Sequence, residues 1–362
     1  MAEFALIERI RARAGTRGDV LLGIGDDAAL LRVPEGQVLV VSTDTLIAGR
    51  HFPHESAAAD IGWKSLAVNL SDLAAMGASP AWASLALTLP SADAGWLDDF
   101  LDGFLELAQM HDVALVGGDT TRGALSITVT VQGFVPANEA LRRSGARIGD
   151  DVWVTGTLGD AAGALQQWRL GGMQSAKLRY RLDRPTPRIG AALALRGRAS
   201  SAIDISDGLV ADLGHILDAS GVGAELDLGR LPTSRTLAEH FADENLRWNE
   251  EKGCHDFSEP DWEEFFNVIA GNGPCNAERL GARVGRAGCA RDGRQAGRLA
   301  GVQGGRRQAY EGRLTWPSTP PGPPLPKGRC SPRPTLRCSP ICPALPRSVT
   351  TGLSTAGGSY RA

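Results

Sequence analysis

The sequence predicts an α/β protein made of two units, with the boundary between them near residue 148. Short apolar runs alternate with longer segments whose apolar residues recur at helical spacing, and this alternation is typical of sheets covered by helices. In the stretch LSITVTVQGFV (125–135) apolar side chains occupy every second position, which is the period of a strand with one buried face. A polar turn, RSGARIGD (143–150), separates the two units.

The first unit, residues 1–148, opens with the segment MAEFALIERIRARAG, which spaces Ile7 and Ile10 among charges. This spacing predicts an amphipathic helix, and the segment lacks the uninterrupted apolar core of a signal peptide. The remaining elements follow from buried apolar runs and from apolar stripes at helical spacing. In order, they are a buried strand over 37–43, helices over 60–78 and 96–112, a short strand over 113–116 that ends in a Gly-Gly turn, and the alternating strand over 125–135.

The second unit begins with DVWVTG at residues 151–156, which predicts a strand. Strands and helices alternate again after it, as they do in the first unit. The expected elements are helices near 160–170 and 188–196, a strand over 201–206, a helix over 208–220 and a strand over 224–228.

The whole-chain composition is that of a globular protein. The chain has 362 residues and 43% hydrophobic residues, with a formal net charge of -3. This balance gives no reason to expect a nucleic acid or an anionic membrane surface as partner, and no apolar run approaches the roughly 20 residues that a membrane span needs. We expect a cytoplasmic protein.

The composition changes after about residue 248. All six cysteines follow residue 250, and none forms a zinc-type C-x2-C pair. The stretch 249–290 resembles part of the catalytic subunit of phenylacetyl-CoA oxygenase, but it contains no Glu-x-x-His ligand pair. The last stretch, 291–362, is rich in proline and arginine, and such a composition predicts disorder. We therefore expect a truncated second unit over 149–248, in a fused or frameshifted reading frame.

Aspartates follow several of the predicted strands, where α/β sheets place ligand-binding groups. Taken singly, each also fits a turn former or a helix N-cap, and Asp207 before Gly208 is a good N-cap by itself. As a set they would repel one another unless divalent cations lay among them. Asp44, Asp119, Asp204 and Asp207 stand at strand ends, whereas Asp27 follows Gly25 in a turn and Asp72 lies off the apolar stripe of its helix.

An oxygen-only ligand set favours Mg2+ over zinc, and Mg2+ usually bridges carboxylates to phosphates. The sequence therefore indicates a nucleotide, although it has neither a G-x-x-x-x-G-K-[ST] loop nor a protein-kinase motif set. The phosphates would then be held by metal ions, by backbone N–H groups of glycine turns and by an arginine. Arg143 is a candidate, although a lone arginine in a polar loop is more often solvated.

Seven motifs, in order, resemble the thiamine-monophosphate kinase family, within the superfamily of aminoimidazole ribonucleotide synthetase. The resemblance covers residues 1–248. The motifs are GIGDDAALL, STDTLIAGRHF, KSLAVNLSDLAAMGASPAW, LVGGDTTRG, LRRSGARIGD, VTGTLGDAAGAL and AIDISDGLVADLGHI.

The resemblance implies ATP-dependent phosphorylation of thiamine monophosphate to thiamine diphosphate, by direct in-line transfer. It also implies a homodimer formed by β-structure of the first unit, although a solvated polar face on strand 125–135 is the alternative. It places His51 at the thiamine phosphate, for which a surface histidine is the alternative. The implied Mg2+ ligands are Asp27, Ser42, Thr43, Asp44, Asp72, Asp119, Asp204 and Asp207, and the implied ATP contacts are Gly118, Asp119, Arg143 and Ser206.

The family's acidic GGEDYEL-like substrate motif and a later aromatic residue do not appear after Trp248. Two alternatives to a working kinase therefore stay open. The chain is either a catalytically impaired, nucleotide-binding remnant of a fused or frameshifted gene, or a superfamily member that acts on another small substrate. The wording STDTLIAGRHF argues against the second alternative.

Overall fold

The computed structural model describes residues 3–171, 175–227 and 230–240, and the backbone of five short strands at 248–249, 254–255, 266–271, 278–285 and 313–315. The features expected for 249–290 and 291–362 lie outside the described residues, apart from those strands. No helix in the described part of the chain combines the length and apolarity that a bilayer crossing requires.

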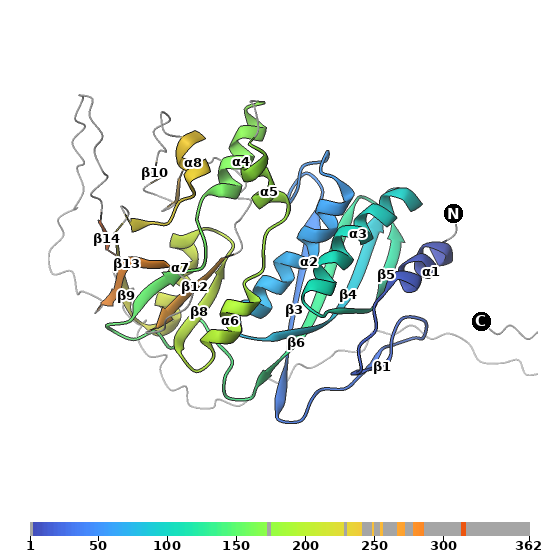
Figure 1. The fold of residues 1–362 in the computed structure, drawn as a ribbon, viewed down its shortest axis with the longest axis horizontal. Helices are drawn as coiled ribbons and strands as arrows, with labels where there is room; N and C mark the ends of the chain where they lie inside the picture. Colours follow the sequence, from blue (N-terminus) through green and yellow to red (C-terminus); the bar gives the residue numbers. More distant parts are fainter. Residues whose placement is uncertain are drawn as a thin grey trace, which may run out of the picture. The chain divides into compact units, whose positions relative to one another are not determined.

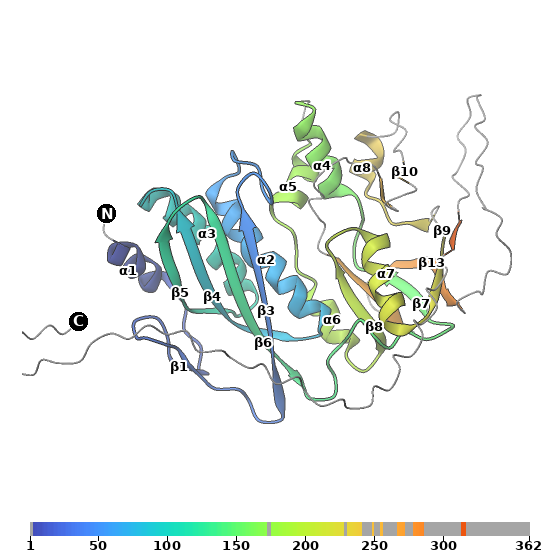
Figure 2. The same cartoon turned by 180° about the vertical axis from the view of Figure 1, so that it is seen from behind.

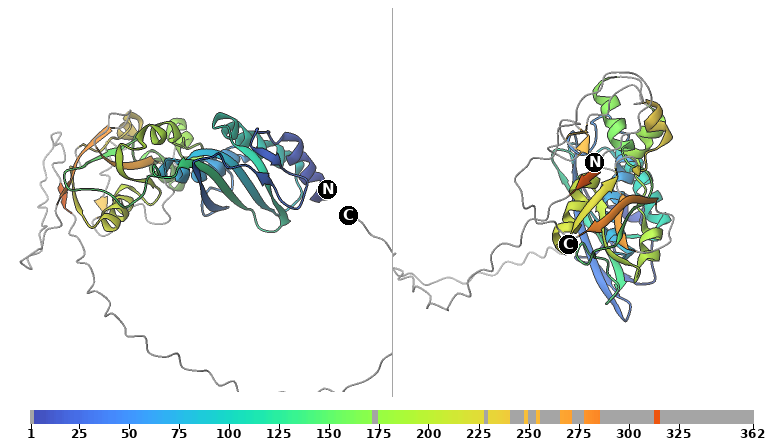
Figure 3. Two further views of the ribbon diagram at one scale, coloured as in Figure 1. Left: turned by 90° about the horizontal axis from the view of Figure 1, so that it is seen from below. Right: turned by 90° about the vertical axis from the view of Figure 1, so that its left-hand side faces the viewer.

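A four-stranded sheet organises the first unit (Figure 1). Its order is β3-β6-β4-β5, in which β4 and β5 are parallel and the other neighbours antiparallel. Helices α2 (Ala58–Ala75) and α3 (Ala94–Met110) cover one face, as the view from below in Figure 3 also shows. The strands are β3 (Gln37–Ile47), β4 (Ser79–Leu89), β5 (Ala114–Arg122) and β6 (Ser126–Pro136).

The alternation predicted for strand β6 is present. Ile127, Val129 and Val131 are fully buried on the face that α2 and α3 cover, whereas the threonines between them are half-buried on the other face. We call these the helix face and the open face of the sheet (Figure 2). The hydrophobic core of the first unit lies on the helix face.

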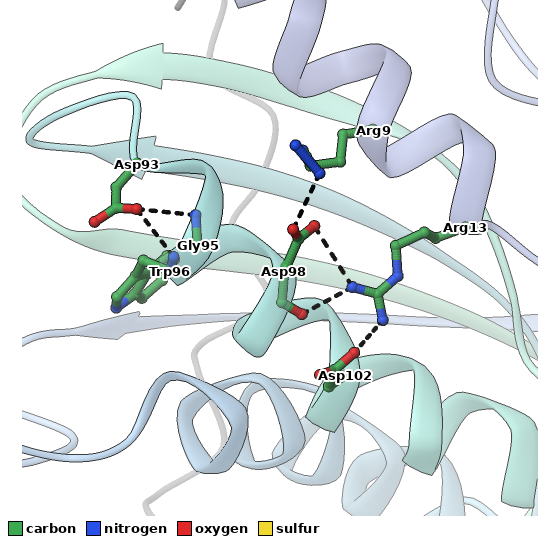
Figure 4. A network of polar contacts seen from close by, with 7 residues as sticks. All are labelled: Arg9, Arg13, Asp93, Gly95, Trp96, Asp98 and Asp102. Atoms are coloured by element: carbon green, nitrogen blue, oxygen red, sulfur yellow. Dashed lines mark hydrogen bonds and ion pairs between the residues drawn. The ribbon is translucent and has the colours of Figure 1, made fainter.

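Close contact between backbones fixes the helix layer. A Cβ atom on Gly103 of α3 would lie 1.8 Å from the carbonyl oxygen of Ala59 in α2, so only glycine allows this approach. Helix α1 (Glu3–Arg13), as predicted, lies against α3, where Arg9 contacts Asp98 at 3.0 Å and Arg13 contacts Asp98 and Asp102 (Figure 4).

Two of the expected strands differ from the sequence expectation, and strand β4 was not expected. Strand β3 was expected to be buried and to end at residue 43, but it continues to Ile47, and Val41 and Ile47 are 54% and 46% exposed. The reason is that these side chains lie on the sheet face that α2 and α3 do not cover, on an edge strand with a neighbour on one side only. Strand β5 was expected to end in a Gly-Gly turn, but it runs through Gly117 and Gly118 with a bulge and ends at Arg122.

A small hairpin contacts part of the open face. It consists of β1 (Val20–Leu22) and β2 (Leu30–Leu31), whose Val20 and Leu31 pack against a cluster around Trp82 and Phe134. Asp19, which precedes the hairpin, accepts a hydrogen bond from Trp82 Nε1 at 3.0 Å. The hairpin leaves the exposed side chains of β3 uncovered by the described part of the chain.

A six-stranded sheet organises the second unit, with order β14-β9-β13-β7-β12-β8. Helix α7 (Leu209–Ser220) packs on it through a core that includes Val152, Ile203 and Leu213. The strands are β7 (Asp151–Val154), β8 (Ala199–Ile205), β9 (Gly223–Asp227), β12 (Phe266–Gly271), β13 (Glu278–Gly285) and β14 (Arg313–Thr315). A separate two-stranded sheet pairs β10 (Trp248–Asn249) with β11 (Cys254–His255).

Four helices of the second unit join the core of the first. They are α4 (Asp160–Arg169), α5 (Ala176–Asp183), α6 (Ile189–Leu195) and α8 (Arg235–His240), and α5 and α8 were not expected from the sequence. Hydrogen bonds reinforce this packing, because Trp63 Nε1 donates to the Pro185 carbonyl at 2.8 Å and Arg196 donates to Ser79 Oγ at 2.8 Å. The boundary at residue 148 is thus a boundary between sheets, while the packing continues across it.

Candidate functional site

Helix α2 and strand β3 together position the first part of the candidate site. Asn69 on α2 is fully buried, and its Oδ1 accepts the backbone N–H of Asp44 at 3.0 Å, while its Nδ2 donates to the Ser65 carbonyl at 2.9 Å. Ser42 Oγ donates to Asp72 Oδ2 at 2.5 Å. Because side chains alternate along a strand, Ser42 and Asp44 both point to the helix face, where they meet α2.

Three carboxylates interact in a row that we call the carboxylate row: Asp44 on β3, Asp72 on α2 and Asp204 on β8. Burial raises the pKa of Asp44. Burial, with repulsion from Asp44, raises the pKa of Asp72 to about 6, against opposing effects of Ser42 and Arg143. Burial and then repulsion from Asp72 raise the pKa of Asp204 to about 7. The two sheets therefore bring these acids together from three separate elements.

The row continues into the turn between β8 and α7. Asp212 on α7 is 2% exposed, and its Oδ2 accepts the backbone N–H groups of Ser206 at 2.8 Å and Asp207 at 3.1 Å. Burial raises the pKa of Asp212. The N-cap residue of α7 is Gly208, and no side chain caps it, so the reading of Asp207 as the N-cap was wrong. Instead, the carboxylate of Asp212, inside the helix, accepts hydrogen bonds from the backbone N–H groups of Ser206 and Asp207.

The open face holds a different set of the implied residues. Thr43 and Thr45 of β3 pair their hydroxyls with Thr130 and Thr128 of β6 at 2.9 and 2.8 Å. Asp119 stands opposite Ala86, and Ala86 stands opposite Thr128, so Asp119 belongs to this face at the far edge of the sheet. Within one chain, Asp44 and Asp119 thus lie on opposite faces and on opposite edge strands.

Gly118, beside Asp119, has a structural requirement of its own. Its φ is +151°, and a Cβ atom there would lie 1.8 Å from the Leu85 carbonyl oxygen. Only glycine lets β5 approach β4 so closely here, two residues after the bulge at Val116. The direction of the backbone N–H groups at Gly118 therefore follows from the geometry of strand β5, and not from a turn.

Asp27 stands apart from the carboxylate row in the described contacts. It is exposed in the β1–β2 loop, where its N–H donates to Asp26 Oδ1 at 2.8 Å. The guanidinium of Arg11 lies against Gly25 in the same loop. No described contact joins this loop to Asp44, Asp72 or Asp204.

Two further residues are linked to the carboxylate row. His51 follows β3, the strand that carries Asp44, and the positive charge of Arg143 acts on Asp72. His51 Nδ1 accepts the N–H of Ile47 at 2.9 Å, just after β3 ends. Burial, together with the positive charges of Arg50 and Lys64, lowers the pKa of His51. The exposed Arg143 is close enough to Asp72 to lower its pKa.

The donor set of the carboxylate row fits a hard divalent cation. It offers carboxylate oxygens and the Ser42 hydroxyl, without sulfur or imidazole nitrogen. The buried Ser71 hydroxyl has no hydrogen-bond partner of good geometry within the described residues, yet it is near enough to Asp204 to lower its pKa. However, among the described residues no three His, Cys, Asp or Glu side chains converge closely enough to hold a metal ion by themselves. Further ligands would have to come from phosphates or water.

Sequence reasoning missed Asn69, Lys64 and Asp212. Lys64 is 5% exposed on α2, and its charge acts on His51 and Asp183. A polar or charged residue within an apolar helical segment was the available signal for Asn69 and Lys64, because such residues are rarely buried without a partner. No comparable signal marked Asp212, which occupies an ordinary position in the first turn of a helix.

Comparison with known proteins assigns the chain to a family. The AIR synthase related protein N-terminal domain matches residues 25–135, and the C-terminal domain of the same family matches residues 147–282. Thiamine-monophosphate kinase of Escherichia coli (strain K12) is 53% identical over 253 residues, which are 68% of this chain and 78% of that protein. The Haemophilus influenzae enzyme is 47% identical over 255 residues, 67% of this chain and 78% of that protein.

Solved structures agree with this assignment. The crystal structure of thiamine-monophosphate kinase from Stenotrophomonas maltophilia K279a has a TM-score of 0.68 and 47% identity, and the match covers 79% of this chain and 95% of that one. AaThiL complexed with AMPPCP and TMP has a TM-score of 0.62 and 28% identity, over 78% and 91% of the two chains. The predicted two-unit α/β fold is confirmed by these matches, and the chain belongs to the thiamine-monophosphate kinase family.

Proposed function

We propose that this chain catalyses ATP-dependent phosphorylation of thiamine monophosphate to thiamine diphosphate. The relatives that it matches are thiamine-monophosphate kinases, and one solved relative carries AMPPCP and TMP. The observation that carries the proposal is the carboxylate row of Asp44, Asp72 and Asp204. Burial makes these charges unfavourable by themselves, and a cation bound to triphosphate oxygens would offset that cost.

Mg2+ would be held by Asp44, Asp72 and Asp204, with Ser42 beside Asp72. Bound there, Mg2+ neutralises charge on the transferring phosphoryl group. Asn69 fixes the backbone of Asp44, and Ser42 orients the carboxylate of Asp72 by its hydrogen bond. The side chains thus position charge, which is the main requirement of direct in-line phosphoryl transfer, and no phosphoenzyme is needed.

The remaining roles follow the motif positions. Arg143, whose charge already acts on Asp72, and the backbone near Gly118 and Ser206 would contact ATP. His51 would contact the thiamine phosphate from the turn after β3. Asp27, Thr43, Asp119 and Asp207 would supply the outer metal ligands.

We further propose a homodimer formed over the open face. Edge strand β3 exposes Leu39, Val41 and Ile47, and an exposed apolar edge strand favours pairing with another chain. The dimer would also explain how Asp119 takes part in the site. Within one chain, Asp119 lies on the opposite face and the opposite edge strand from Asp44. In a dimer formed over the open face, Asp119 would lie in the interface between the two copies. Location in the cytoplasm stays a prediction from the sequence.

A catalytically impaired, nucleotide-binding remnant is the second candidate. The sequence motif expected on the thiamine side is missing after Trp248, whereas the carboxylate row is encoded entirely before that point. Under this alternative, Mg2+-dependent nucleotide binding persists without phosphoryl transfer.

Two measurements test the proposal. Calorimetric titration with AMPPCP, with and without Mg2+, tests nucleotide binding, and we expect binding only with Mg2+. Coupled detection of ADP release in the presence of thiamine monophosphate tests transfer. Magnesium-dependent binding without ADP release selects the remnant, and binding that is indifferent to Mg2+ rejects both candidates.

A further inference from the structure

The end of β8 and the turn that follows it carry three of the residues to which the proposed function assigns roles: Asp204 in the strand, and Ser206 and Asp207 in the turn. The shape of this turn depends on a residue outside the turn. Asp212, one helical turn into α7, directs one carboxylate oxygen back to the N–H groups of Ser206 and Asp207, at 2.8 and 3.1 Å. Carboxylate acceptors make stronger hydrogen bonds to backbone N–H groups than neutral acceptors do.

A simple role as a helix cap does not account for this contact. The N–H groups that Asp212 accepts belong to residues before the N-cap Gly208, outside the helix. Gly208 has a φ of +101° and no side chain, so the backbone at this point has no preference that would hold the turn. The two hydrogen bonds to Asp212 therefore tie Ser206 and Asp207 to α7.

The surroundings of Asp212 are well defined. It is 2% exposed and packs within a helix whose neighbours Leu213 and Ile216 are fully buried. The groups whose charges act on it are Asp207 and His215. Its own charge acts on Asp204, at the end of the carboxylate row. Asp212 is thus buried and hydrogen-bonded at the point where the turn meets the row.

We propose that Asp212 is a positioning residue for the metal–nucleotide half of the site. It does not contact substrate. It fixes the backbone of Ser206 and Asp207, so that the Asp207 carboxylate and the Ser206 backbone face the same side as Asp204. This inference rests on the proposed function, since it concerns how the same site is arranged.

The test compares Asp212→Asn with Asp218→Asn in the full-length chain. Asn keeps the size and one acceptor oxygen but removes the charge that strengthens both hydrogen bonds. Asp218 lies on the same helix, is exposed, and serves as the matched control. Two quantities are measured: the Kd of AMPPCP at saturating and at low Mg2+, and amide hydrogen exchange at residues 206 and 207.

We expect Asp212→Asn to weaken Mg2+-dependent AMPPCP binding by about 10-fold or more, because residues behind a metal site typically have effects of that size. Most of the loss should appear as a higher Mg2+ requirement, with faster amide exchange at Ser206 and Asp207. A merely structural residue would lower stability without moving the Mg2+ requirement of the folded protein.

The outcomes separate this inference from the proposed function. If the unmodified chain binds AMPPCP with Mg2+ and the two variants bind equally well, the positioning role is wrong while the proposed function stands. If the unmodified chain shows no Mg2+-dependent binding, both are wrong. Should Asp212→Asn fold too poorly for titration, Asp212→Glu, which keeps the charge but moves it by one methylene, must show the same selective rise in Mg2+ requirement.

Discussion

The two faces of the four-stranded sheet carry the same kinds of residue in very different environments. On the helix face, Ser42 and Asp44 meet α2, and burial there raises the pKa values of Asp44 and Asp72. On the open face, Thr43 and Thr45 pair with neighbouring hydroxyls near exposed apolar side chains. The comparison teaches that one strand can supply a buried electrostatic site and an exposed association surface, because its side chains alternate.

The largest expected effect concerns the helix face. Replacing Asp72 with alanine should reduce Mg2+-dependent AMPPCP affinity by more than the roughly 100-fold limit typical of outer residues, because Asp72 is the central member of the carboxylate row. Titration calorimetry measures the change. Asp99→Ala, at an exposed position on α3, is the control and should bind normally. Equal affinity in the two variants would contradict a metal site at the row.

The helix face should also make stability depend on pH. The folded-state pKa values of Asp72 and Asp204 are about 6 and about 7, above the ordinary 3.8, so the folded protein holds protons that the unfolded chain releases. Without metal, the free energy of unfolding should therefore decrease as pH rises from about 4 to 7, by up to roughly 1.4 kcal/mol per pH unit for each group.

Urea unfolding at pH 5 and pH 8 measures this dependence. Adding Mg2+ and AMPPCP should reduce the loss at pH 8, since ligand binding to the folded state stabilises it. Asp204→Asn should flatten the profile because it removes one of the two titrating groups. A profile that rises between pH 5 and 8 without metal would show that these carboxyls are not the dominant groups.

The open face should respond through association. Val41→Lys places a charge on the exposed edge strand β3, and charged edge residues oppose strand pairing. We expect the dimer dissociation constant to rise by about 10-fold or more, since 1.4 kcal/mol corresponds to a factor of ten. Sedimentation equilibrium measures it. Leu170→Lys, at a position that is 70% exposed elsewhere in the chain, should leave association unchanged.

The smallest expected effects are the changes in the free energy of unfolding when a single hydrogen bond is removed from each face. Asn69→Ala leaves the Asp44 N–H without its partner in a buried setting and should destabilise the fold by about 1–3 kcal/mol. Thr45→Val removes an exposed hydroxyl pair on the other face and should change stability by only about 0.2–1 kcal/mol. Urea titration of both variants tests the ranking, and similar losses would mean that the faces do not differ as described.

Sequence patterns alone determined much of this protein. The helical stripe of α2, the alternation of β6 and the alternation of strands with helices follow from local periodicity, which folding preserves, whereas β4, α5 and α8 were missed. The seven motifs were sufficient for the family, and the sequence also named Asp44, Asp72 and Asp204, whose charges interact in the structure. These features are encoded within short segments, so no knowledge of the partner elements was needed.

Tertiary structure decided the rest. The apolar run of β3 has the same local pattern whether its strand lies at the centre or at the edge of a sheet, so only the strand order shows that it is exposed. Asp119 and Asp44 follow similar sequence patterns but fall on opposite faces, because a bulge at Val116 sets the register of β5 against β4. The role of Asp212 depends on hydrogen bonds to residues five and six positions earlier across a non-helical turn, a geometry that no local period encodes.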